Sequence, residues 1–155
     1  MVERPGEDYG YQRFLDTVDC VVIGRKTYET ALTCPSWPYE GKYCQVLTSR
    51  EDLVSRHGVE LMMNDAHAIF DDLQRRKGQR VYVDGGAVVR QFLEAGLVTD
   101  MTLSVIPVLL GSGVRLFGDA KRDLPFELVA SRSFPSGLVQ SEYRYSGERA
   151  KSDEW

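Results

Sequence analysis

Three short segments bring glycines, hydroxyls and basic side chains together: Gly24-Arg25-Lys26-Thr27, Thr48-Ser49-Arg50 and Asp84-Gly85-Gly86-Ala87. Each follows an apolar run that predicts a β-strand. Open α/β sheets bind ligands beyond the carboxyl ends of their strands, so each segment is a candidate binding site. These residue types suit the binding of phosphate groups.

The first segment opens with a glycine that lets the backbone turn at a strand end, because it carries no Cβ. The helix that follows would offer free N–H groups to an anion, with Arg25, Lys26 and the Thr27 hydroxyl beside it. A solvated basic helix start with a capping threonine explains the same residues equally well.

The second segment supplies two hydroxyls and a guanidinium. This set suits a phosphate monoester, such as the 2′-phosphate that separates NADPH from NADH. Taken alone, the segment is better explained as a turn in which Thr48 or Ser49 caps a helix that begins at Glu51 and Asp52.

The third segment contains paired glycines, Gly85 and Gly86, which would let a pyrophosphate approach the backbone and a helix N-terminus. The spacing is not G-x-G-x-x-G, so it carries no Rossmann fingerprint. A tight turn is the alternative. Three such segments in one short chain are stronger evidence for a phosphate-binding site than any one of them alone.

The elements that must position these segments alternate between strand and helix up to about residue 106. Apolar stripes predict helices at 8–18, 25–31, 66–78 and 87–95, the third capped by Asn64 or Asp65. Strands are predicted at 19–24, 43–48, 59–63, 80–84 and 101–106, and a terminal antiparallel hairpin at 126–134 and 138–145. This order predicts an α/β fold, a three-layer α/β/α sandwich with a mostly parallel mixed sheet and a C-terminal antiparallel hairpin. We expect one domain over 1–155, with 146–155 a frayed tail.

Composition narrows the class of protein. The net charge is −4, from 19 basic and 23 acidic residues without a basic stripe, which gives nucleic-acid binding little support. The longest nearly apolar stretch, 105–110, is too short to cross a bilayer, and the N-terminus lacks an apolar signal region. Cys20, Cys34 and Cys44 form no C-x-x-C pair and no zinc pattern; Cys20 and Cys44 fall in apolar runs and are expected to be buried. We expect a cytoplasmic protein without a metal site.

The ordered motifs resemble those of a known family. Gly24 to Glu29 (GRKTYE) looks like the dihydrofolate reductase motif G-R-x-T-[WY]-E, and Val83 to Ala87, leading into Gln91-Phe92-Leu93, is similar to its glycine-pair motif. Ile106 to Gly113, with Leu116-Phe117, is closer still to the reductase domain of the bifunctional riboflavin-biosynthesis protein and its stand-alone relatives. The resemblance runs from about Gly6 to Tyr145.

The resemblance implies an NADPH-dependent reductase that acts on a pterin-like or aminopyrimidine-like heterocycle, or on a related carbonyl or imine. By position, 24–27 would hold the pyrophosphate and neighbouring phosphate, and 48–50 the adenosine end. Asp84, Gly85, Gly86, Ala87 and Val88 would cradle the middle of the cofactor. It also implies a homodimer that pairs near 101–110. The alternative is a non-catalytic dinucleotide-binding protein or a structural homodimer.

One departure limits the mechanism. Relatives open with a strand and a motif like S-L-D-G-x-I-A, placed between the counterparts of 80–84 and 101–106, whereas residues 1–8 here are polar. Either the sequence begins after that strand, or the protein lacks it and a partner chain or local repacking fills the gap. The first explanation is favoured, because a gap in a buried sheet leaves backbone groups unpaired.

No proton donor can be assigned from the sequence. Asp84 is the nearest candidate, and it is at least as well explained as a cap of the helix that begins near Ala87. The carboxylates at 51–52 and 71–72 fall on polar helix faces and are expected to be solvated. Tyr28, Trp37 and Tyr39 could wall a heterocycle pocket, and loop packing around the neighbouring prolines explains them equally well.

Overall fold

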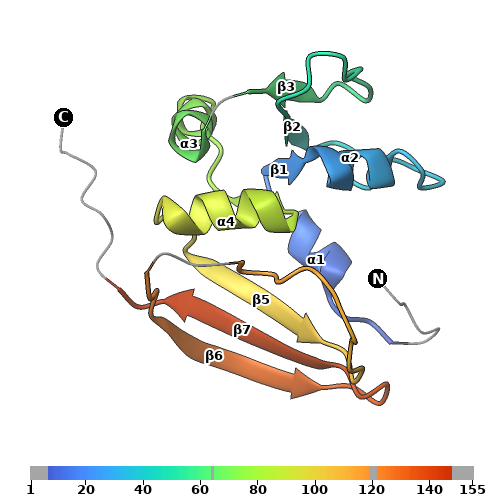
Figure 1. Ribbon diagram of the computed structural model, residues 1–155, viewed down its shortest axis with the longest axis vertical. Coiled ribbons are helices and arrows are strands. Elements are labelled where there is room, and N and C mark those ends of the chain that lie inside the picture. The colour runs from blue at the N-terminus through green and yellow to red at the C-terminus, as the bar shows by residue number, and fades with distance from the viewer. Residues whose placement is uncertain (1–6, 64, 119–121, 148–155) are drawn as a thin grey trace. The chain divides into compact units, whose positions relative to one another are not determined.

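The computed structural model describes residues 7–63, 65–118 and 122–147. Its elements follow the predicted order (Figure 1): α1 Tyr11–Asp16, β1 Cys20–Gly24, α2 Arg25–Ala31, β2 Tyr43–Leu47, β3 Glu60–Met62, α3 Ala66–Arg75, β4 Val81–Asp84, α4 Gly86–Glu94, β5 Asp100–Val105, β6 Phe126–Ser133 and β7 Val139–Tyr145. The chain divides into two compact units. We call residues 10–95 the parallel unit, and the described residues of 7–9 and 96–147 the antiparallel unit. The single-domain organisation stays a prediction.

The parallel unit is built on a four-stranded sheet in the order β3-β2-β1-β4, with all pairings parallel. The central strand β1 is the most apolar run of the unit, and Val21, Val22 and Ile23 are completely buried. Parallel strands covered on both faces read as continuous apolar runs, which is why this strand was predictable.

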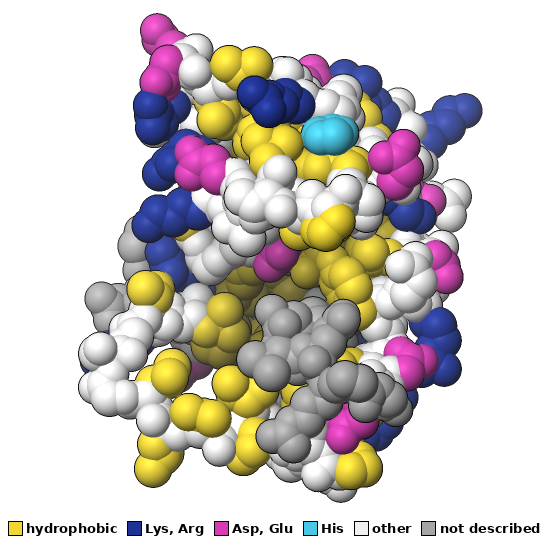
Figure 2. Space-filling view, turned by 90° about the vertical axis from the view of Figure 1, so that its right-hand side faces the viewer, with side chains coloured by type: hydrophobic (Ala, Val, Ile, Leu, Met, Phe, Trp, Pro, Cys, Tyr) yellow, Lys and Arg dark blue, Asp and Glu magenta, His cyan; other side chains and the backbone are white. Residues whose placement is uncertain are grey.

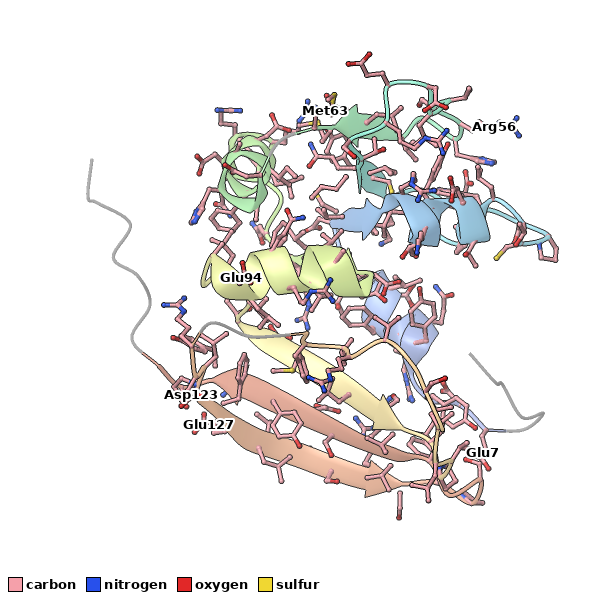
Figure 3. All side chains as sticks on the ribbon, in the orientation of Figure 1. Glu7, Arg56, Met63, Glu94, Asp123 and Glu127 are labelled. Carbon is pink, nitrogen blue, oxygen red and sulfur yellow. The ribbon has the colours of Figure 1, made fainter. Side chains whose placement is uncertain are left out.

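Helices cover both faces of this sheet. Val21 and Ile23 belong to a buried cluster that includes Leu15 of α1 and Tyr28 of α2. Side chains alternate along a strand, so Cys20, Val22 and Gly24 face the other side. There Gly24 lies against Val88 of α4. The α/β layering expected from the sequence is therefore confirmed. Figure 3 draws the side chains on these helices and strands.

The predicted cap of α3 is also confirmed. The Asp65 carboxylate accepts a hydrogen bond of 2.9 Å from the backbone N–H of Ala68, while Asn64 lies outside the described residues. This bond satisfies one of the free donors at the helix start.

The antiparallel unit holds a three-stranded sheet in the order β5-β7-β6. The predicted hairpin pairs β6 with β7, and its turn contains Gly137 at φ +84°. Tyr9 packs edge-on against Phe134, with ring centroids 5.0 Å apart, and its carbonyl accepts a hydrogen bond from Gln140. Among the described residues, β4 and β5 each pair on one side only.

Many large apolar side chains of the antiparallel unit are exposed. They lie on the segment after β5 and on its neighbouring strands: Val105, Ile106, Val108, Leu109, Leu110, Val114, Leu116, Leu128 and Val129. Figure 2 shows hydrophobic side chains reaching the surface on one face, among intermixed acidic and basic side chains. None of the described helices is long and apolar enough to span a bilayer.

Candidate functional site

The sheet of the parallel unit brings the three predicted segments to one edge. In the parallel register, Gly24 at the end of β1 lies beside Leu47 at the end of β2. On the other side of β1, Ile23 pairs with Asp84 at the end of β4. The segments that begin at Gly24, Thr48 and Asp84 therefore leave the carboxyl edge of the sheet side by side.

The first and third segments touch each other closely. Gly85 has φ +94°, and a Cβ built there would lie 2.8 Å from the Thr27 hydroxyl oxygen and 3.6 Å from the Gly24 nitrogen. A Cβ at Gly24 would lie 3.2 Å from Cγ2 of Val88. Any residue but glycine would crowd this junction, so glycine at position 85 is what lets the two segments come into contact. The junction lies at the carboxyl end of the parallel sheet, where open α/β sheets bind their ligands.

The remaining predicted residues of these two segments differ in exposure. Gly86 is half-buried, and Lys26 and Ala87 are exposed. Val88 is 2% exposed and packs in the core, so it can serve a ligand only through its backbone and by positioning Gly24.

The second segment forms a turn. The Thr48 hydroxyl accepts a hydrogen bond of 3.0 Å from the Arg50 N–H, and no helix begins at Glu51. The prediction that Thr48 or Ser49 caps a helix is therefore wrong. The Thr48 hydroxyl closes a local turn instead. Ser49 and Arg50 are exposed at the edge where β2 ends.

Both predicted phosphate-binding arginines are paired with carboxylates of their own segments. Arg25 donates from Nη1 to both carboxylate oxygens of Glu29, at 2.7 Å each. Arg50 donates from Nε to Oδ1 of Asp52 at 2.8 Å and from Nη2 to Oδ2. Neither partner was predicted, although the four-residue spacing of Arg25 and Glu29 on a helix is a signal for such a pair.

Asp84 does not cap helix α4, which was the alternative to its role as a proton donor. Gly85 occupies the N-cap position of α4, and Asp84 accepts a 2.7 Å hydrogen bond from the Gly85 N–H. Burial raises the pKa of Tyr82 and of Tyr39, and the nearby Asp84 carboxylate raises both further. Asp84 therefore lies beside phenols that keep their protons. This geometry assigns no catalytic role to it.

The aromatic group Tyr28, Trp37 and Tyr39 is core. Their exposed fractions are 0%, 9% and 4%, and the rings meet edge to face at centroid distances of 6.0 and 5.3 Å. Trp37 also stacks on His57 at 4.8 Å. The explanation by core packing is therefore the one that fits these three rings.

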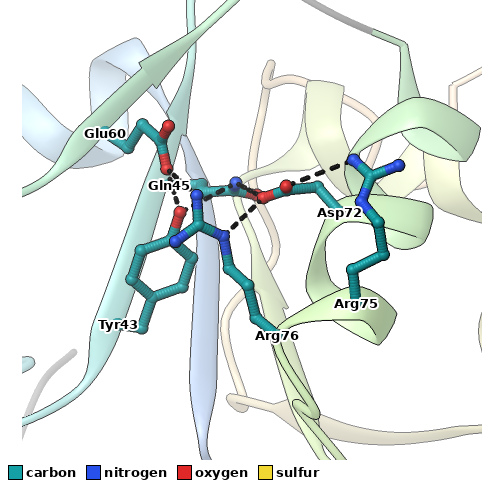
Figure 4. A network of polar contacts seen from close by, with 6 residues as sticks. All are labelled: Tyr43, Gln45, Glu60, Asp72, Arg75 and Arg76. Atoms are coloured by element: carbon teal, nitrogen blue, oxygen red, sulfur yellow. Dashed lines mark hydrogen bonds and ion pairs between the residues drawn. The ribbon is translucent and has the colours of Figure 1, made fainter.

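A polar network lies on the α3 side of the sheet (Figure 4). Buried Gln45 donates to Oδ2 of Asp72 at 2.9 Å and to the Tyr43 hydroxyl at 3.2 Å. Tyr43 donates to Glu60, and Arg76 bonds both Asp72 and Glu60. The expectation that Asp72 is solvated is therefore wrong. The network joins β2, β3 and α3 and lies toward the start of β2, so it is structural.

The predicted burial of Cys20 and Cys44 is confirmed. Cys20 and Cys44 are buried and Cys34 is exposed. Burial raises the pKa of the Cys44 thiol to about 12, which leaves very little thiolate near neutral pH. Cys44 is therefore an inert core residue.

The fold and this edge define a class of protein. The RibD C-terminal domain family matches residues 16–140, so the chain belongs to that family. The expected resemblance to riboflavin-biosynthesis reductase domains is confirmed, and with it the dihydrofolate-reductase-like α/β fold.

Particular relatives agree with this family. The chain is 35% identical over 144 residues to the uncharacterized protein YwjB of Bacillus subtilis (strain 168), which covers 91% of this chain and 82% of that one. It resembles the structure of a putative riboflavin biosynthesis protein from Shewanella sp. PV-4, with TM-score 0.82, 29% identity, and 94% and 84% of the two chains covered. A Thermotoga maritima diaminohydroxyphosphoribosylaminopyrimidine deaminase/5-amino-6-(5-phosphoribosylamino)uracil reductase shares the fold, with TM-score 0.64 and 19% identity over 90% of this chain and 49% of the other.

Proposed function

We propose that the protein is an NADPH-dependent reductase that transfers hydride to a small pterin-like or aminopyrimidine-like heterocycle, or to a related carbonyl or imine. The observation that carries this proposal is the convergence of three strand ends, with Gly85 held against Thr27 and Gly24. The Thermotoga maritima protein that shares this fold is named as a 5-amino-6-(5-phosphoribosylamino)uracil reductase, which supports a heterocycle as the substrate class.

Each segment would bind a different part of the cofactor. The glycine junction would admit the pyrophosphate, with Arg25 and Lys26 supplying positive charge. Thr48, Ser49 and Arg50 would bind the adenosine end, and Arg50 would meet the 2′-phosphate. When bound, NADPH supplies hydride from its nicotinamide ring. We assign no proton donor.

Nucleotide titration tests the proposal. We expect saturable binding of NADPH that is tighter than that of NADH. Arg50→Ala should weaken NADPH binding by about tenfold and leave NADH binding unchanged, because only NADPH carries the 2′-phosphate. Arg56→Ala removes another exposed arginine from the same unit and is the matched control. Absence of saturable binding of either nucleotide would contradict the cofactor assignment.

Turnover is tested separately. If NADPH binds, loss of the reduced-nicotinamide absorbance with candidate heterocycles distinguishes a reductase from a dinucleotide-binding protein without catalysis. Binding without any such loss would favour the non-catalytic alternative.

We also propose that two copies pair through the region 101–110. The exposed apolar side chains of Val105, Ile106, Leu109 and Leu110 support this, since contiguous apolar surface marks association sites. Sedimentation is expected to give a dimer, and a monomer at high concentration would overturn the proposal.

A further inference from the structure

The Arg50 guanidinium is already occupied by a carboxylate. Asp52 accepts hydrogen bonds from Nε and Nη2 through its two oxygens, so the pair is bidentate. Both side chains are more than half exposed, at 53% and 66%. The pair therefore lies at the surface, where an incoming nucleotide can reach it.

A second ion pair follows the neighbouring strand β1. Arg25 and Glu29 are joined at 2.7 Å, with side chains 31% and 44% exposed. The two pairs influence each other. Glu29 contributes to raising the pKa of Arg50, after the larger effect of Asp52. Arg25 contributes to lowering the pKa of Asp52, after the larger effect of the Arg50 hydrogen bond. The two ion pairs are therefore electrostatically coupled, although each is closed by its own hydrogen bonds.

A carboxylate and a phosphate compete for the same donors. Both present oxygens that match the planar fork of a guanidinium, so a phosphate that takes this edge of Arg50 must displace Asp52. A phosphate bound to the other edge of Arg50 would still lie near the negative charge of Asp52, which repels it. In either geometry, Asp52 lowers the affinity for a phosphate at Arg50.

The two carboxylates differ in which nucleotide they oppose. In the proposed binding mode, Arg50 meets the 2′-phosphate, which NADH lacks, while Arg25 meets the pyrophosphate that both nucleotides carry. Asp52 should therefore oppose NADPH selectively, and Glu29 should oppose both nucleotides.

We propose that Asp52 is a specificity-determining residue that occupies Arg50 in the absence of ligand and thereby limits the preference for nucleotides with a 2′-phosphate. This inference rests on the proposed NADPH site. Asp52 acts through Arg50, with Glu29 as its counterpart at Arg25.

Titration of carboxylate variants with NADPH and NADH tests the inference. Asp52→Asn should tighten NADPH binding about two- to fivefold and leave NADH binding unchanged, the range expected for an exposed ion pair. Glu29→Gln should tighten both nucleotides. Glu51→Gln is the matched control, since Glu51 is an exposed neighbour to which the described contacts give no ion pair. It removes the same charge and should change NADPH affinity less than Asp52→Asn does.

The double variant Asp52→Asn/Arg50→Ala isolates the mechanism. On the Arg50→Ala background, Asp52→Asn should have no more effect than Glu51→Gln. If Arg50→Ala weakens NADPH binding while Asp52→Asn behaves like Glu51→Gln, the inference is overturned and the NADPH site stands. If Arg50→Ala has no effect on NADPH binding, the adenosine-end assignment itself fails.

Discussion

The two compact units differ in the burial of their apolar side chains. In the parallel unit, β1 is buried on both faces, and helices α3 and α4 contribute Leu73 and Phe92 to the interior. In the antiparallel unit, Leu109 is fully exposed and Val114 is 92% exposed. A parallel sheet needs cover on both faces, and β1 has it. Leu109 and Val114 lie on the irregular segment after β5, outside the strands of the antiparallel sheet. The contrast shows that the apolar side chains of the parallel unit form a core, whereas those of the segment after β5 do not.

The largest expected difference is in stability. Leu73→Ala removes a fully buried side chain and should lower the free energy of unfolding by about 2–5 kcal/mol. Leu109→Ala removes a fully exposed one and should change it by less than about 0.5 kcal/mol. Denaturant unfolding followed by circular dichroism measures both. If Leu109→Ala lowers the free energy of unfolding by an amount that depends on protein concentration, Leu109 lies in a dimer interface, and the contrast is one between a core and an interface. If Leu73→Ala and Leu109→Ala lower the free energy of unfolding equally at every protein concentration, the contrast between the two units is wrong.

Thiol labelling tests the burial of the parallel unit directly, since all three cysteines lie in that unit. At pH 8, Cys44 should alkylate at least about a hundredfold more slowly than exposed Cys34, because it is buried and its pKa is raised to about 12. Mass spectrometry of the alkylated peptides gives both rates, and labelling in denaturant is the control for intrinsic reactivity. Similar rates in the native protein would mean that the parallel unit opens readily.

Alanine substitution of one glycine in each unit should have different effects on nucleotide binding. Gly85 in the parallel unit and Gly137 in the antiparallel unit both have positive φ, +94° and +84°. Replacing Gly137 by alanine should cost about 1–2 kcal/mol of stability, because a side chain strains this backbone conformation. Replacing Gly85 should cost more, because its Cβ would also lie 2.8 Å from the Thr27 hydroxyl oxygen. Only Gly85→Ala should also abolish NADPH binding, measured by titration at a temperature where both variants are folded. Retained binding in Gly85→Ala would remove the glycine junction from the proposed site.

The fold was largely predictable because its strongest signals are local. The buried run before Gly24 and the strand–glycine–helix junction at 84–86 follow from β-branched residues and from glycines at turns. The convergence of the three segments also followed, since parallel strands end at the same edge of a sheet.

Side-chain pairing was less predictable, because it depends on geometry that spacing does not determine. Asp52 meets Arg50 through the conformation of a turn that was expected to be a helix start. Asp72 looked solvated on a polar helix face, and Gln45, from a strand far away in sequence, brings it into a network. The exposure of the segment after β5 was equally hidden, since an apolar run alone does not tell a core from an interface.

The close approach of Gly85 to Thr27 has a consequence for how the sequence can vary. A side chain at position 85 has no room while the Thr27 hydroxyl stands 2.8 Å from the Cβ position. The two positions, 58 residues apart in the chain, therefore constrain each other. We expect natural variants to keep glycine at 85 wherever 27 bears a hydroxyl, and to lose both together in lineages that abandon the nucleotide.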